Sequence, residues 1–229
     1  MAVKGTEGHC YLCGEEYGRT GMRTHLIKKH FAIPDPDNKE TQDCLLIRIE
    51  GKYDNRYWLY IDIPKTSTLN TLDGFLRDIW LECCGHLSAF SAGTRCDFVE
   101  IGMSRKIKTL SPGDVLTHEY DFGSTTECKI TVIAEVTRPK QRKAVRVLGR
   151  NNPIKYICCK CGKPADYIDQ MALYECDEDL FYCEKCMEET NEDCEFALPV
   201  TNSPRMGVCG YCGEYDIYEY DEHACLQEV

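Results

Sequence analysis

Three segments decide the fold: CLLIRIE (44–50), RYWLYIDI (56–63) and TLNTLDGFLRDIWLEC (68–83). The first two are rich in β-branched and aromatic residues, which predicts two strands joined by a turn at 51–55. In the third, apolar residues recur at helical spacing and predict a helix with one apolar face. We expect that face to pack into the core.

Further strands are predicted downstream, near 86–91, 95–101, 115–121 and 126–136, where apolar and β-branched residues alternate between turn signals. Two strands, one helix and four more strands form an α+β pattern. The sequence therefore predicts a central, largely antiparallel sheet with one main helix, flanked by small zinc-stabilised modules.

Composition sets the class of protein. The chain has 229 residues, and 43% of them are hydrophobic, which is typical of a globular protein with a real core. No run approaches the ~20 apolar residues that span a bilayer. The opening MAVKGTEGHCYLCGEE lacks the apolar core of a signal peptide, so we expect a cytoplasmic protein that does not enter a membrane.

Cysteine is the most unusual feature of the composition. The chain has 17 cysteines, and in a reducing compartment such a number indicates metal binding before disulfides. Eight of them form C-x-x-C pairs: Cys10/Cys13, Cys158/Cys161, Cys183/Cys186 and Cys209/Cys212. Gly14, Gly162 and Gly213 follow three of these pairs, and glycine tolerates the left-handed turn of a zinc knuckle.

The first pair begins a longer motif. Residues 10–30 read C-x2-C-x3-Y-x4-M-x2-H-x4-H, which resembles a two-Cys/two-His zinc finger with Tyr17 and Met22 at its core positions. The predicted zinc ligands are Cys10, Cys13, His25 and His30.

The finger is poorly suited to reading DNA. Such fingers contact bases from helix positions −1, 3 and 6. Counting back from His25 as position 7, these positions hold Gly18, Gly21 and Thr24. Two glycines offer no side chain to a base edge, so we expect no sequence-specific DNA binding by this finger.

The remaining pairs predict two more zinc sites near the C-terminus. Cys158, Cys161, Cys183 and Cys186 have a spacing close to that of a zinc ribbon or treble clef, with Cys158 favoured over Cys159 by the C-x-x-C register. A last site is predicted from Cys209, Cys212, His223 and Cys225, while Cys176 and Cys194 are alternative ligands for either site. About three Zn²⁺ per chain are therefore expected.

Residues 43–137 carry a family resemblance. The succession LLIRIE, WLYIDIP, TLDGFLRDIWLECCGHLSAF, LSPGDVLTHEYDFGS and TVIAEV is similar to the plasmid pRiA4b Orf-three-like family, also called insertion-element passenger proteins. Its most specific piece is Tyr120–Gly123, and LPVTNSPRMGVCGY (198–211) is similar to the zinc-bearing tail of some members. Ser124 and Thr125 depart from the acid and aromatic residue of relatives. The resemblance implies a fold and no established reaction.

The sequence gives little support for an enzyme. It has no H-E-x-x-H motif, no zinc-deaminase pattern, no Walker loop and no nucleophile elbow. Cys84 and His86 could form a metal or thiol site with Cys96 or Cys128. Alternatively, the cysteines are small buried hydrophobes beside a helix cap at Gly85. We expect a protein that is not an enzyme.

Charge is distributed unevenly. The net charge of −11 combines −4 over residues 1–137, +7 over 138–155 and −14 over 156–229. The basic stretch is a candidate phosphate-binding surface, whose candidate nucleic-acid residues are Arg138, Lys140, Arg142, Lys143, Arg146 and Arg150. Alternatively, it is a solvated linker that pairs with the acidic tail.

The expected organisation is a zinc finger (1–33), a linker (34–43), an α+β domain (44–137), a basic linker (138–155) and a C-terminal zinc module (156–229). We expect an adaptor or accessory protein that binds a protein partner or large assembly. RNA or ribonucleoprotein binding through the basic stretch and the finger helix is the alternative, and a zinc- or thiol-dependent enzyme comes third. The oligomeric state is not predicted.

Overall fold

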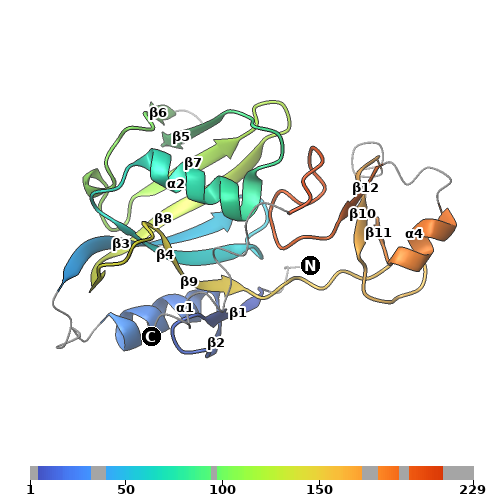
Figure 1. The fold of residues 1–229 in the computed structure, drawn as a ribbon, viewed down its shortest axis with the longest axis horizontal. Helices are drawn as coiled ribbons and strands as arrows, with labels where there is room; N and C mark the ends of the chain where they lie inside the picture. The colour runs from blue at the N-terminus through green and yellow to red at the C-terminus, as the bar shows by residue number, and fades with distance from the viewer. Residues whose placement is uncertain (1–4, 32–39, 94–96, 172–179, 191–195, 214–229) are drawn as a thin grey trace.

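The computed structural model describes residues 5–31, 40–93, 97–171, 180–190 and 196–213 (Figure 1). The predicted α+β class is confirmed by a nine-stranded sheet, in which all paired strands are antiparallel. Its strand order is β2-β1-β9-β4-β3-β8-β7-β5-β6. The strands are β1 (Glu7–Cys10), β2 (Glu16–Gly18), β3 (Thr41–Gly51), β4 (Trp58–Pro64), β5 (Ser88–Ala92), β6 (Val99–Ile101), β7 (Val115–Tyr120), β8 (Thr126–Pro139) and β9 (Arg146–Asn151).

Strands β3 and β4 form the centre of the sheet and are buried on both faces. Alternate side chains of a strand point to opposite faces. Leu45 and Ile47 accordingly join one apolar cluster, whereas Cys44 and Leu46 join another on the opposite face. Burial on two sides explains why CLLIRIE is nearly continuous in its apolar residues rather than alternating.

One face of the sheet is covered by the predicted helix (Figure 1). It consists of α2 (Leu69–Leu76) and a π-helical turn, η2 (Arg77–Leu81). Thr68 caps the start, since its side chain accepts a hydrogen bond from the backbone N–H of Thr71. A short 3₁₀ turn, η3 (Ile107–Thr109), lies in the connection between β6 and β7.

The opposite face is covered by the N-terminal finger (Figure 1). The finger contains β1, β2, α1 (Arg19–His25) and a second π-helical turn, η1 (Leu26–His30). Met22 and Leu26 are fully buried against Trp58 and Tyr60 of β4. Because β1 also pairs with β9, the finger is continuous with the central sheet rather than a separate module.

Residues 138–155, expected to be a basic linker, are folded into the domain. They contain β9, which lies between β1 and β4 in the sheet. Val147 and Leu148 of β9 are buried, one in each apolar cluster. The strand was not predicted because its basic residues suggested a solvated linker. Two of them, Arg146 and Arg150, instead form contacts within the protein.

A small C-terminal unit follows β9 (Figure 1). It contains β10 (Tyr167–Asp169), β11 (Phe181–Tyr182), α4 (Glu184–Thr190) and β12 (Ala197–Pro199), with strand order β11-β10-β12. Residues 203–211 then return to the central domain, where Ser203 donates a hydrogen bond to the backbone oxygen of Trp80 at 2.6 Å. The described residues of the expected unit 156–229 therefore lie in two places in the fold.

Among the residues that the structure describes, no helix has the length and hydropathy required to cross a membrane.

Candidate metal centres

Three groups of cysteine and histidine side chains bring four donor atoms each within 4.8 Å of one another. In the order in which they are described below, the groups are Cys10/Cys13/His25/His30, Cys158/Cys161/Cys183/Cys186 and Cys83/Cys84/His86/Cys209. The cysteines that the structure describes are not joined by disulfides. All three groups can hold a metal ion.

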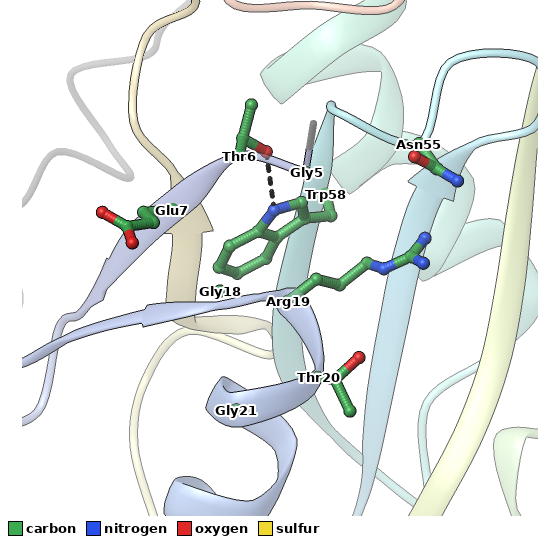
Figure 2. Close-up of a pocket in the computed structure, with 9 residues that line it drawn as sticks. All are labelled: Gly5, Thr6, Glu7, Gly18, Arg19, Thr20, Gly21, Asn55 and Trp58. Carbon is green, nitrogen blue, oxygen red and sulfur yellow. Dashed lines mark hydrogen bonds between the residues drawn. The ribbon is translucent and has the colours of Figure 1, made fainter. Parts of the chain in front are cut away.

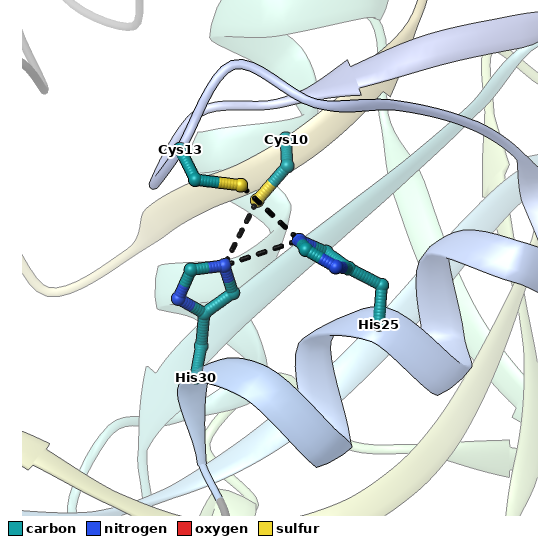
Figure 3. A group of neighbouring side chains, drawn as sticks. All are labelled: Cys10, Cys13, His25 and His30. Atoms are coloured by element: carbon teal, nitrogen blue, oxygen red, sulfur yellow. Dashed lines mark hydrogen bonds between the residues drawn. The ribbon is translucent and has the colours of Figure 1, made fainter.

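The first group assembles the four predicted finger ligands (Figure 3). Two cysteines come from the hairpin and two histidines from the helix that faces it. The Sγ–Nε2 distances are 3.5 Å for Cys10 and His30 and 3.3 Å for Cys13 and His25. The two Nε2 atoms are 3.1 Å apart.

A π-helical turn brings the two histidines together. Residues five apart lie about 140° from each other around an α-helix of 3.6 residues per turn. In η1 the backbone N–H of Phe31 instead donates to the oxygen of Leu26, 3.2 Å away, and this wider turn returns His30 to the face of His25. The x4 spacing between the histidines is thus accommodated by the backbone.

The surroundings of the finger group favour neutral imidazoles, the form that binds metal. Burial lowers the pKa of His25 and of His30. The Nδ1 atom of His25 faces the carboxylate of Glu15 at 3.6 Å, on the side away from the sulfurs. Gly14 has φ +76° and donates to the oxygen of Cys10, as expected of a knuckle turn.

The second group consists of four cysteines in the C-terminal unit. The Sγ atoms of Cys161 and Cys183 are 3.6 Å apart. Burial acts to raise the pKa of the Cys158 thiol, but the backbone N–H groups of Cys183, Cys161 and Lys160 lower it to about 6. The structure brings Cys158 into the group and leaves its neighbour Cys159 exposed outside it.

The third group differs from the one expected at the C-terminus. Cys209 lies against Cys83, Cys84 and His86 of the central domain. The Sγ of Cys84 is 3.7 Å from the sulfurs of both Cys83 and Cys209 and 2.9 Å from Nε2 of His86. The sulfur of Cys209 is 3.3 Å from the same nitrogen.

Other cysteines considered in the sequence fall elsewhere. Cys212, paired with Cys209 in the sequence, is exposed and is not a member of the third group. Cys128, a suggested partner of Cys84, is buried in the core beneath α2. The remaining predicted or alternative ligands lie outside the described residues: Cys96, Cys176, Cys194, His223 and Cys225.

These spacings suit a tetrahedral metal ion. For zinc about 2.3 Å from sulfur and about 2.0 Å from nitrogen, tetrahedral geometry separates neighbouring donors by about 3.3–3.8 Å. The observed distances run from 2.9 to 3.7 Å. Thiolate and imidazole ligands also suit zinc by their softness.

The predicted nucleic-acid residues are largely engaged within the protein. Arg138 and Arg146 both contact the buried carboxylate of Asp62, at 2.5 Å each. Arg150 donates to the backbone oxygen of Asn202 at 2.5 Å. The other three candidates, Lys140, Arg142 and Lys143, are exposed between β8 and β9, and Lys140 lies 3.6 Å from Glu40.

A shallow pocket lies at the start of the finger helix (Figure 2). Gly18 and Gly21, two of the positions that read bases in other fingers, line it together with Arg19 and Trp58. Arg19 forms an ion pair with Glu50, 2.5 Å away. The start of the helix therefore contacts this protein's own sheet through Arg19.

Comparison with known proteins finds a likeness among solved structures. No family model and no curated protein sequence matches the chain. Among solved structures, it is similar to the crystal structure of the protein of unknown function MM3350 from Methanosarcina mazei Go1, with 13% sequence identity. The TM-score is 0.41, and the match covers 48% of this chain and 69% of that one. The function of this chain must therefore be inferred from its own residues.

Proposed function

We propose that this chain is a cytoplasmic zinc-binding accessory protein that binds a protein partner without catalysing a reaction. The observation that carries the proposal is the completeness of its ligand sets. The finger and the four-cysteine group each supply four protein donors, which fill a tetrahedral shell. A catalytic zinc keeps one position open for water or substrate, so closed sets favour structural zinc.

The sequence pattern from LLIRIE to TVIAEV also supports placing the central domain with the pRiA4b Orf-three-like proteins, whose fold it would share. That assignment adds no reaction. The assignment is consistent with a central domain that has a structural role and carries small zinc-binding units.

Exposed apolar side chains offer a surface for the protein partner. Leu87 is 73% exposed and Phe122 is 59% exposed. They lie on neighbouring segments, because the backbone N–H of Asp121 donates to the oxygen of Leu87 at 2.9 Å. Phe98 and Val99, also exposed, lie before and in the edge strand β6. Apolar residues exposed in this way are typical of a contact surface.

The test is affinity purification of the tagged full chain from its own cells after nuclease treatment. A stoichiometric protein should remain bound to the wild type and be lost from Leu87→Ser/Phe122→Ser. Tyr53→Ser, at a side chain that is 81% exposed, is the matched control and should retain it. The proposal would be contradicted if the wild type and both variants recovered the same proteins in equal amounts.

The nucleic-acid alternative is tested in parallel by salt-dependent retention on RNA. With Arg138, Arg146 and Arg150 engaged, Lys140, Arg142 and Lys143 would have to carry phosphate binding. We expect no change in retention when Arg142 and Lys143 are replaced by glutamine. A bound species that disappears with nuclease and with these substitutions would instead favour RNA.

A further inference from the structure

We propose that Cys83, Cys84, His86 and Cys209 bind a third zinc ion, which fastens residues 203–211 to the central domain. This inference rests on the zinc chemistry of the proposed function but not on a protein partner. It differs from the site expected at Cys209, Cys212, His223 and Cys225, because only Cys209 is common to both.

The donors converge from two segments that are distant in sequence. Cys83, Cys84 and His86 follow the end of η2, and Cys209 arrives more than 120 residues later. All four donor atoms lie within 4.8 Å of one another, and three of the distances among them, 3.3 to 3.7 Å, are those of a tetrahedral zinc shell, while Cys84 Sγ and His86 Nε2 are closer, at 2.9 Å. Two of the cysteines come from adjacent positions, which a C-x-x-C search does not detect.

Backbone conformation supports a built site. Cys209 has φ +52°, a left-handed conformation that costs free energy for a residue with a side chain. Gly85 has φ +78°, which turns the chain between Cys84 and His86. Asp121, beside the group, has φ +65°. Metal ligation would compensate for the strain at Cys209.

A buried arginine is placed to neutralise the bound group. A zinc ion with three thiolates and one imidazole has a net charge of −1. Arg205 has no exposed surface, and its Nη2 lies 3.4 Å from Sγ of Cys83 and 2.7 Å from Oδ2 of Asp121. The guanidinium therefore contacts both a ligand sulfur and a carboxylate. Arg205 belongs to the same segment as Cys209, so the segment is attached to the central domain at two points, through Arg205 and through Cys209.

Tyr120, whose ring lies against Arg205, positions the ligand loop. Its hydroxyl accepts from the backbone N–H of His86 at 3.3 Å and donates to Oε1 of Glu82 at 2.9 Å. Glu82 in turn accepts from the N–H of Gly85 at 2.6 Å. The motif Tyr120–Gly123, which had no assigned role, is therefore the support of this site: Tyr120 holds the ligand loop and Asp121 holds Arg205.

The test is the zinc content of the purified full chain, determined by mass spectrometry of the metal. Wild type should hold three zinc ions, and Cys84→Ser and Cys209→Ser should each hold two. Cys212→Ser and His223→Asn are the controls and should hold three. Two zinc ions in wild type and Cys84→Ser alike would overturn the third site. So would loss of one zinc ion from His223→Asn but not from Cys84→Ser.

Hydrogen exchange supplies a readout independent of metal counting. In Cys209→Ser the amides of 203–211 should exchange faster, while those of 180–190 remain as in wild type. Unchanged exchange at 203–211 would contradict the fastening role. If the inference fails alone, two zinc ions remain in the wild type and the partner still binds. If the proposed partner binding fails alone, three zinc ions remain and no protein is recovered.

Discussion

At the scale of single residues, the buried ion pairs show why basic composition misled the linker assignment. Asp62 has no exposed surface and contacts both Arg138 and Arg146. Arg138 is also almost completely buried, at 1% exposure. A buried charge is tolerated only when it is paired, so Asp62 holds Arg138 in the interior and the partly buried Arg146 beside it.

Removing the charge of Asp62 should therefore be costly. Asp62→Asn leaves Arg138 buried beside a neutral group, and we expect a loss of about 3–5 kcal/mol in the free energy of unfolding, measured by urea denaturation. Glu135→Gln is the control, because its ion pair with Lys65 is largely exposed and should contribute less than about 1 kcal/mol. Equal effects of both substitutions would refute the structural role of Asp62.

Asp73 should make the stability depend on pH. Burial acts to raise its pKa, but hydrogen bonds from His118, Ser88 and Arg77 outweigh burial and hold the pKa at about 2, below the ordinary 3.8. Its contribution is present above the unfolded pKa and is lost as the pH falls through the folded one.

We therefore expect Asp73→Asn to reduce the free energy of unfolding by about 2 kcal/mol at pH 6 and by progressively less between pH 4 and pH 2. Urea titrations of the wild type and the variant at each pH measure this difference. Release of metal in acid affects both proteins equally and so cancels. Asp97→Asn, at an exposed position, should track the wild type throughout. A difference for Asp73→Asn that stays constant down to pH 2 would contradict the expectation.

At the scale of elements, the finger packs closely against the central sheet. Gly8 of β1 lies so close to β9 that a Cβ there would come within 1.9 Å of the backbone oxygen of Arg150. Gly149 is similarly close to Met22 of the finger helix, whose sulfur would lie 3.0 Å from an added Cβ. Glycine at both positions permits close packing of finger and sheet.

Gly8→Ala should therefore separate β1 from β9. We expect a loss of about 1–3 kcal/mol in stability and faster hydrogen exchange in α1. Gly5→Ala is the matched control, because an added Cβ there meets nothing within 4 Å. Unaltered exchange in α1 would show that the finger does not depend on this pairing.

Elements with a clear periodicity of apolar residues or a known ligand spacing could be predicted from the sequence. Elements that depend on long-range packing could not. The alternating and apolar patterns predicted β3, β4 and α2, and the finger spacing predicted the four donors that the structure brings together. Strand β9 was not predicted because Arg146 and Arg150 were interpreted as charges in solvent, whereas both form contacts within the protein. The grouping of Cys209 depends on how residues 200–209 fold back, which local spacing does not encode. The sequence CCGH (83–86), already a candidate metal or thiol site, was the available signal for this group.

At the scale of the molecule, we expect the units to differ in how much they need metal. The apolar cluster of the C-terminal unit contains five buried residues, of which Cys158, Cys183 and Cys186 belong to the four-cysteine group. Such a core is too small to fold on its own. The central sheet, by contrast, has a large apolar cluster under α2 that contains none of the grouped donors.

Chelation should therefore unfold the units unequally. On removal of zinc, we expect hydrogen-exchange protection to vanish over 180–190 and to persist in β3, β4 and α2. Cys183→Ser should reproduce the local loss without chelator, and Cys159→Ser should not. A single cooperative loss of protection over the whole chain would show that the central sheet also depends on metal.

The position of β9 has a consequence for how the protein is made. Strand β1 pairs with the nearby β2, but its other sheet partner, β9, lies about 140 residues downstream and must then enter between β1 and β4. At roughly 5–20 residues per second, that partner arrives several seconds or more after the finger. The finger can acquire its metal during this interval, and its helix is then ready to cover the second face of the sheet. Translation speed over residues 31–151 should thus influence the yield of correctly assembled protein.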